Sequence, residues 1–70
     1  MNILYQTDGR ITAAGPYTEM DTEFVFDDRI IPKVVLPEGW KMADIDVPDD
    51  FTIFTYTVVD GALVKLPPPN

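Results

Sequence analysis

Hydrophobic residues are densest in residues 51–66, where β-branched and aromatic side chains dominate. An Asp60-Gly61 pair interrupts this run once, and three consecutive prolines end it. Two strand-like runs on either side of an Asp-Gly pair are typical of a β-hairpin. We therefore predict a hairpin with a two-residue loop over residues 51–66, followed by a proline-rich tail at residues 67–70.

A two-residue loop assigns each side chain of this hairpin to one of two faces, because side chains alternate along a strand. One face carries Phe51, Ile53, Thr55, Thr57, Val59, Ala62, Val64 and Leu66. The other face carries Phe54, Tyr56, Val58, Leu63 and Lys65. Both faces are largely apolar, whereas a sheet with one side in water should alternate cleanly. The rest of the chain is short, so we predict that another chain buries one face.

A second, smaller hairpin is predicted at residues 2–14, where two strand-like runs flank Asp8-Gly9. Gly accepts a positive φ without steric cost and Asp tolerates it, so this pair favours a type I′ turn. The predicted fold class is therefore all-β. It is a small antiparallel sheet built from two Asp-Gly hairpins with an extended middle segment.

The middle of the chain has a less regular pattern. Residues 23–26 alternate with period two and predict a strand, while residues 18–21 have the spacing of a capping box and leave a helical turn as the alternative. Proline interrupts the aliphatic run at residues 29–36, which favours an edge strand or an extended arm. Residues 40–47 change phase near Ala43, which fits a β-bulge.

Composition indicates a folded chain and limits how it can be stabilised. The 70 residues are 46% hydrophobic and 24% charged, which is typical of one folded domain over residues 1–70. Cysteine and histidine are both absent, which excludes disulfides and argues against structural zinc. A domain of this size buries only roughly 60% of its unfolded surface, so a partner subunit is the leading source of further stability.

The charge of the chain argues against several partners. A formal net charge of -7, from 12 acidic and 5 basic residues, disfavours direct binding to nucleic acid. The first residues lack the basic and apolar regions of a signal peptide, and no run approaches the ~20 apolar residues of a membrane span. We expect a protein made and retained in a reducing cytoplasm until assembly, with no membrane partner.

Residue types give little support for catalysis. The chain contains no Ser, Cys or His, so a Thr or Lys nucleophile lacks an obvious base. Glycosidase-like chemistry needs paired carboxylates in a cleft, which a short chain rarely makes. Carboxylate pairs occur at Asp27/Asp28, Asp44/Asp46 and Asp49/Asp50. The run at residues 44–50 departs from a calcium loop, since Pro48 and Asp49 occupy its fifth and sixth positions. We predict no enzymatic activity, cofactor, metal or small-molecule substrate.

The candidate site is therefore an interface with another protein. Strand addition is predicted at residues 30–36 and at the final hairpin. Trp40 is a candidate anchor, although it can equally be the main core residue of a small fold. The predicted interface residues are Ile30, Ile31, Val34, Val35, Leu36, Trp40, Phe54, Tyr56, Val58 and Leu63.

Two stretches, PEGWKMADIDVPDDF at residues 37–51 and VVDGALVKLP at residues 58–67, resemble segments of small tailed-bacteriophage proteins, including tail-fibre-associated proteins. The opening at residues 3–12 is similar to the amino-terminal hairpin of many such proteins. Fibre-assembly chaperones generally continue into a longer carboxy-terminal region, whereas this chain ends at Asn70. The resemblance implies a virion structural component of tail or capsid, made in the host cytoplasm, whose partner is itself or another virion protein.

Two alternative functions remain open. A tail-fibre assembly chaperone would act during assembly and be missing from the finished particle. An acidic inhibitor that mimics DNA and blocks a host enzyme would use the negative charge, and it would require carboxylates arrayed on one surface.

Overall fold

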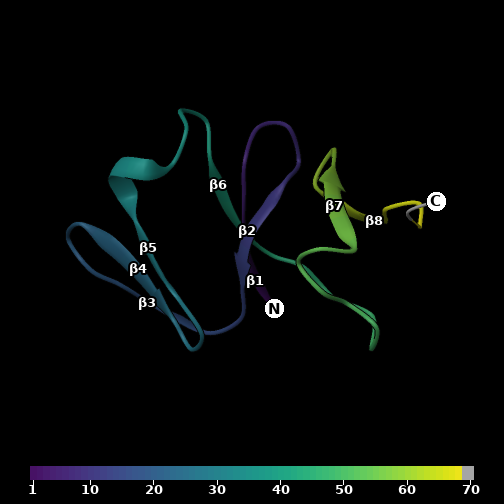
Figure 1. Cartoon of the computed structure of the whole chain (residues 1–70), viewed down its shortest axis with the longest axis horizontal. Coiled ribbons are helices and arrows are strands. Elements are labelled where there is room, and N and C mark those ends of the chain that lie inside the picture. The colour runs from purple at the N-terminus through teal and green to yellow at the C-terminus, as the bar shows by residue number, and fades with distance from the viewer. Residues whose placement is uncertain (69–70) are drawn as a thin grey trace.

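Three small antiparallel sheets follow one another along the molecule in the computed structural model, which describes residues 1–68 (Figure 1). The central sheet has the order β2-β1-β6, the second has the order β3-β4-β5, and the third is the hairpin β7-β8. The predicted all-β class is confirmed, with the strands divided among three sheets. The elements are β1 (Asn2–Tyr5), β2 (Ile11–Ala14), β3 (Tyr17–Glu19), β4 (Glu23–Phe26), β5 (Ile30–Pro32), the 3₁₀ turn η1 (Lys33–Val35), β6 (Lys41–Asp44), β7 (Tyr56–Val59) and β8 (Ala62–Lys65).

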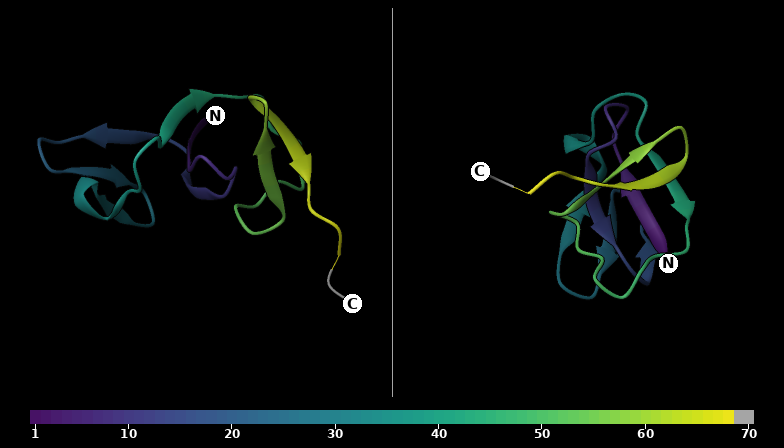
Figure 2. Two further views of the ribbon diagram at one scale, coloured as in Figure 1. Left: turned by 90° about the horizontal axis from the view of Figure 1, so that it is seen from above. Right: turned by 90° about the vertical axis from the view of Figure 1, so that its right-hand side faces the viewer.

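The central strand β1 is buried on both faces, and each face belongs to a different core. Ile3 and Leu4 are both 0% exposed, and as neighbours in a strand they point to opposite sides. One core, beneath the hairpin, consists of Ile3, Ile11, Tyr56 and Val58. The other, beneath the second sheet, consists of Leu4, Ala13, Phe24 and Phe26. The left view of Figure 2 shows the resulting row of sheets from above.

A β-bulge in β2 supplies side chains to both cores. Leu4 pairs with Ala13, but Tyr5 pairs with Ile11, so Thr12 is an extra residue on β2. In a regular strand Ile11 and Ala13 would share one face, because they are two residues apart. The bulge reverses this relation, and the two side chains enter opposite cores.

The two Asp-Gly turns differ in conformation. Asp60 and Gly61 have φ values of 52° and 81°, which suits the two-residue loop that joins β7 to β8. Asp60 is the single non-glycine residue with positive φ in the described chain, so the type I′ turn predicted at Asp8 is wrong. There, the Gly9 amide donates to the Gln6 carbonyl at 2.9 Å, and Gly9 alone, with φ of 90°, closes a longer loop.

The middle segment forms a three-stranded meander. Strand β4 occupies the predicted residues, and the Met20 amide donates to the Glu23 carbonyl at 2.8 Å, so a β-turn replaces the alternative helical turn. Strand β5 lies at the edge of its sheet and ends at Pro32. The 3₁₀ turn η1 follows, so the predicted alternative of an extended arm is wrong beyond Pro32. Strand β6 pairs with β1 in unbroken register, which excludes the bulge near Ala43.

The hairpin joins the central sheet at Gly9. The Val58 amide and the Thr57 hydroxyl both donate to the Gly9 carbonyl, at 2.9 and 2.8 Å. An isolated bridge between Arg10 and Thr57 continues this contact. A side chain at Gly9 would collide with the Val58 carbonyl oxygen, so the close approach requires glycine. Beyond β8, the described part of the predicted tail is exposed, and residues 69–70 lie outside the described residues.

Candidate interaction surface

The structure exposes four of the predicted interface residues and packs the others against the chain itself. Val34 is 90% exposed and Phe54 is 80% exposed, with Ile30 and Val35 also well exposed. Partly buried against the core of the second sheet are Ile31, Leu36 and Trp40. The Trp40 ring lies edge-on to Phe24, with ring centroids 5.3 Å apart. Trp40 is therefore a core residue, which was one of its two interpretations.

The hairpin presents to solvent the face opposite to the one predicted as an interface. Tyr56 and Val58 are buried in the core with Ile3, and Leu63 packs against that core. These three residues are not available to another chain, which corrects their assignment. The other face carries Val59, Val64 and Leu66, each between 42% and 49% exposed. Alternation separated the two faces, but both were apolar, so composition could not show which one packs inward.

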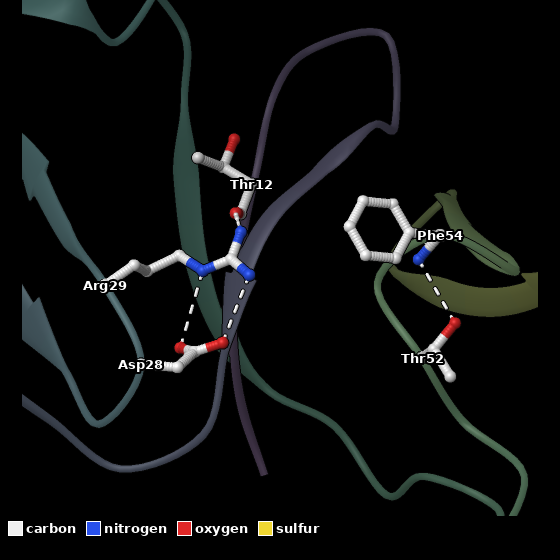
Figure 3. A network of polar contacts seen from close by, with 5 residues as sticks. All are labelled: Thr12, Asp28, Arg29, Thr52 and Phe54. Carbon is white, nitrogen blue, oxygen red and sulfur yellow. Dashed lines mark hydrogen bonds and ion pairs between the residues drawn. The ribbon is translucent and has the colours of Figure 1, made fainter.

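Phe54 projects from a turn, not from the strand predicted over residues 51–55. The Phe54 amide donates to the Thr52 hydroxyl at 3.3 Å (Figure 3). The Thr55 amide donates to the Thr52 carbonyl, also at 3.3 Å. The two threonine hydroxyls are themselves 2.8 Å apart and share a hydrogen bond. Local bonds of this kind compete with strand pairing, so they hold the turn and keep the Phe54 ring outside the core.

Shallow hollows surround Phe54. One of about 420 Å³ lies beside the β1–β2 loop and combines apolar Ile11, Ile53 and Leu66 with the charged groups of Asp8 and Arg10. Another, of about 410 Å³, reaches Lys65 and the first two prolines of the tail. An exposed aromatic ring flanked by concave surface is the arrangement found at the centre of many protein interfaces.

Arg29 forms the rim of a third hollow, of about 290 Å³, that Phe54 also lines. Its guanidinium donates twice to Asp28, at 3.4 and 3.1 Å, and once to the Thr12 carbonyl at 3.3 Å (Figure 3). Thr12 is the bulged residue of β2, so Arg29 ties the second sheet to the irregular point of the central one. The Arg29 hydrogen bonds hold the pKa of the Asp28 carboxyl below its usual value.

Asp50 connects the loop after β6 to the hairpin. Its two carboxylate oxygens accept hydrogen bonds from the Lys65 ammonium and the Tyr56 hydroxyl, both at 2.8 Å. The Lys65 bond and then the Tyr56 bond lower the pKa of Asp50, and the same contacts raise the pKa of Lys65 and of Tyr56. A carboxyl group that acts as a general acid needs a raised pKa, whereas the pKa of Asp50 is lowered.

The remaining carboxylates form no array. Each predicted pair has one member in an ion pair: Asp28 with Arg29, Asp44 with the amino terminus, and Asp50 with Lys65. Of the other acidic residues, Glu19 and Glu23 lie on β3 and β4, and the rest lie in turns and loops along the chain, which does not favour a surface that imitates DNA. Within residues 1–68, no group of three or more acidic side chains could hold a metal ion. No helix in that part of the chain is long and apolar enough to cross a membrane.

Comparison with protein-family models, with curated proteins and with solved structures finds no match to this chain. The candidate interaction surface is therefore defined by geometry alone. It comprises Phe54 and the outer face of the hairpin, which is formed by Val59, Val64 and Leu66. We refer to these four residues as the hairpin surface. Ile30, Val34 and Val35 form a separate exposed group at the far sheet.

Proposed function

We propose that this chain is a structural component of a phage particle, associated with the tail or the capsid, that acts through contacts with other protein chains. The observation that carries the proposal is the hairpin surface, where Phe54 is 80% exposed and three aliphatic side chains are each between 42% and 49% exposed. The phage context rests on the sequence resemblance described above. The proposal assigns no reaction to the chain.

Burial of the hairpin surface would be a strong source of binding energy. Full burial of one large apolar side chain contributes roughly 1.5–3 kcal/mol relative to exposure. Phe54 offers most of its ring, and the Thr52 turn holds the backbone from which the ring projects, so little backbone entropy is lost on binding. A few anchor residues, often aromatic, carry most of the binding energy of measured interfaces.

Mass spectrometry of purified particles tests the proposal. Particles are isolated from a lysate in which the chain is produced, and the chain is quantified against a known capsid protein. We expect a fixed stoichiometry, and a reduced content of the Phe54→Ala variant relative to the Val34→Ala variant. Both variants remove an exposed side chain, so folding is affected little in either. Absence of the parent chain from the particles would overturn the proposal and leave an assembly chaperone as the better interpretation.

A further inference from the structure

Strand β8 has an unpaired edge on the outside of the hairpin. Its partner β7 has neighbours on both sides, because Val58 bonds to Gly9 and Thr57 bridges to Arg10. β8 pairs with β7 alone among the described strands, and Figure 2 shows it at the end of the molecule. The open edge therefore faces away from the central sheet.

The pattern of ladder hydrogen bonds identifies the backbone groups on this edge. The Leu66 amide donates to the Thr55 carbonyl at 2.8 Å, so the polar groups of Leu66 point toward β7. In an antiparallel pair this orientation repeats every second residue, which directs Val64 inward as well. The N–H and C=O groups of Leu63 and Lys65 consequently point outward. Pro67 has no N–H, so the usable edge ends there.

We propose that β8 pairs with β8 of a second copy of this chain, antiparallel, with the two Val64 residues opposite each other. The two hairpins then form one four-stranded sheet, β7-β8-β8-β7, around a two-fold axis. This inference rests on the proposed function and names the partner of the hairpin surface. It also places Ala62 of each copy beside Leu66 of the other, so the exposed apolar stripe becomes continuous across the axis.

The register follows from the outward groups. A pairing centred on Val64 places Leu63 of each copy opposite Lys65 of the other. The two outward N–H groups and the two outward carbonyls of each copy then all have a hydrogen-bond partner. Centring on Leu63 would pair Lys65 with Gly61, whose φ of 81° is not extended. Centring on Lys65 would place two ammonium groups opposite each other and would pair Leu63 with Pro67, which cannot donate.

Charge and proline content favour a second copy at this edge over the edges of β3, β5 and β6. Residues 51–68 contain one acid, Asp60, and one base, Lys65, so they are neutral in a chain of net charge -7. Strands β3, β5 and β6 also have an open edge. Within three positions of β3 there are two acids and no base, and within three positions of β6 there are three acids and one base, whereas the acids and bases near β5 balance. Two copies meeting through β3 or β6 would bring like charges together, whereas the hairpins can approach without this cost. Strand β5 has only three residues and ends at Pro32, which has no N–H to donate to a new ladder.

Disulfide trapping tests the register directly, since the parent chain has no cysteine. In the proposed sheet the Val64 pair is not hydrogen-bonded, so its Cα atoms lie about 4.5 Å apart, within the range of a disulfide. The Val64→Cys variant should form a covalent dimer under mild oxidation. Val59→Cys is the matched control, because Val59 is similarly exposed on the same face but lies on β7. Its counterpart is three strand spacings away, so we expect roughly tenfold less dimer.

A mixture of Ala62→Cys and Leu66→Cys chains provides a second test of the same register. These positions face each other across the axis, so the mixture should yield more covalent dimer than either variant alone. Circular dichroism of each variant confirms that the strands are retained. Equal trapping of Val64→Cys and Val59→Cys, or no dimer from Val64→Cys and from the mixture, would overturn the proposal.

These outcomes are separable from those of the particle experiment. A chain that is present in particles but is not trapped at Val64 keeps the proposed function and loses this partner. A chain that is trapped at Val64 but absent from particles keeps the dimer and loses the virion role.

Discussion

At the scale of single residues, charged side chains hold loops in place. Asp50 is the clearest case, since one carboxylate accepts from both Tyr56 and Lys65 and fastens the loop after β6 to the hairpin. Lys33 has a similar role in the second sheet, where its ammonium pairs with Glu19 at 2.9 Å and lies 5.1 Å from the centre of the Phe24 ring. Such contacts make stability depend on pH.

The first prediction concerns the pH range over which Asp50 contributes to stability. Its pKa is lowered by Lys65, so the contribution is present above the unfolded value of 3.8 and is lost as pH falls through the lower folded value. The raised pKa values of Tyr56 and Lys65 give contributions that are complete below 10.0 and 10.5 and are lost as pH rises through the folded values. Asp50→Asn should therefore make stability depend less on pH at both the acidic and the alkaline end of the range.

Thermal unfolding between about pH 3 and about pH 11 measures this effect. Asp49→Asn is the control, because Asp49 makes no side-chain hydrogen bond or ion pair within the described residues. If the stability of Asp50→Asn changed with pH as steeply as that of the parent at both ends of the range, the stabilising role of Asp50 would be contradicted.

The second prediction concerns Phe24, which is 2% exposed and contacts the rings of Tyr17 and Trp40. Phe24→Ala should lower the free energy of unfolding by about 3–5 kcal/mol, because the cavity cannot be refilled. Val34→Ala, at a 90% exposed position, should change it by less than about 0.5 kcal/mol. Urea titration monitored by Trp40 fluorescence gives both values. Equal effects of the two substitutions would show that Phe24 is not part of a packed core.

At the scale of elements, the sheets are joined at a few irregular points. Gly9 receives the hairpin, and the Thr12 bulge receives Arg29 from the second sheet. In regular strands these carbonyls would accept hydrogen bonds from a neighbouring strand of the same sheet. At the irregular points they instead accept hydrogen bonds from the next sheet and so connect the two.

The third prediction tests the junction at Gly9. Gly9→Ala should destabilise the fold by more than about 2 kcal/mol, because a positive φ and a collision with the Val58 carbonyl act together. Gly61 also has a positive φ, but a methyl group there meets no atom within 4 Å. Gly61→Ala should therefore cost only about 1–2 kcal/mol. Chemical denaturation of both variants isolates the contribution of the close approach, and equal costs would refute it.

Sequence patterns predicted those elements whose signal is local. Strand β4 and the Asp60-Gly61 loop follow from alternation and turn chemistry over a few residues. The Thr12 bulge was not predicted, because it depends on which cores Ile11 and Ala13 must fill. The Thr52 hydroxyl bonds likewise removed Phe54 from a strand that its β-propensity favoured. Tertiary packing decided the bulge, and a single sequence does not contain it. The Thr52 bonds are local, but the strand pattern of residues 51–55 concealed them.

At the scale of the whole molecule, two small cores share the strand β1, and the charge is unevenly divided. The molecule extends 38 × 24 × 22 Å, with the hairpin and the second sheet on opposite sides of the central one. Residues 1–50 carry the entire net charge of -7, because Asp60 and Lys65 cancel in residues 51–68. The hairpin surface is therefore both the apolar and the neutral end of an acidic protein.

The last prediction follows from this division of charge. If two copies meet through neutral hairpins, their acidic parts repel each other weakly from a distance, and salt screens that repulsion. Raising the ionic strength from 0.1 M to 1 M shortens the screening length from about 10 Å to about 3 Å, so the dimer should tighten by roughly threefold. Sedimentation equilibrium in sodium chloride measures the dissociation constant at each concentration. An interface held together by ion pairs would respond in the opposite direction, so a dimer that weakens as salt is added would contradict pairing through β8.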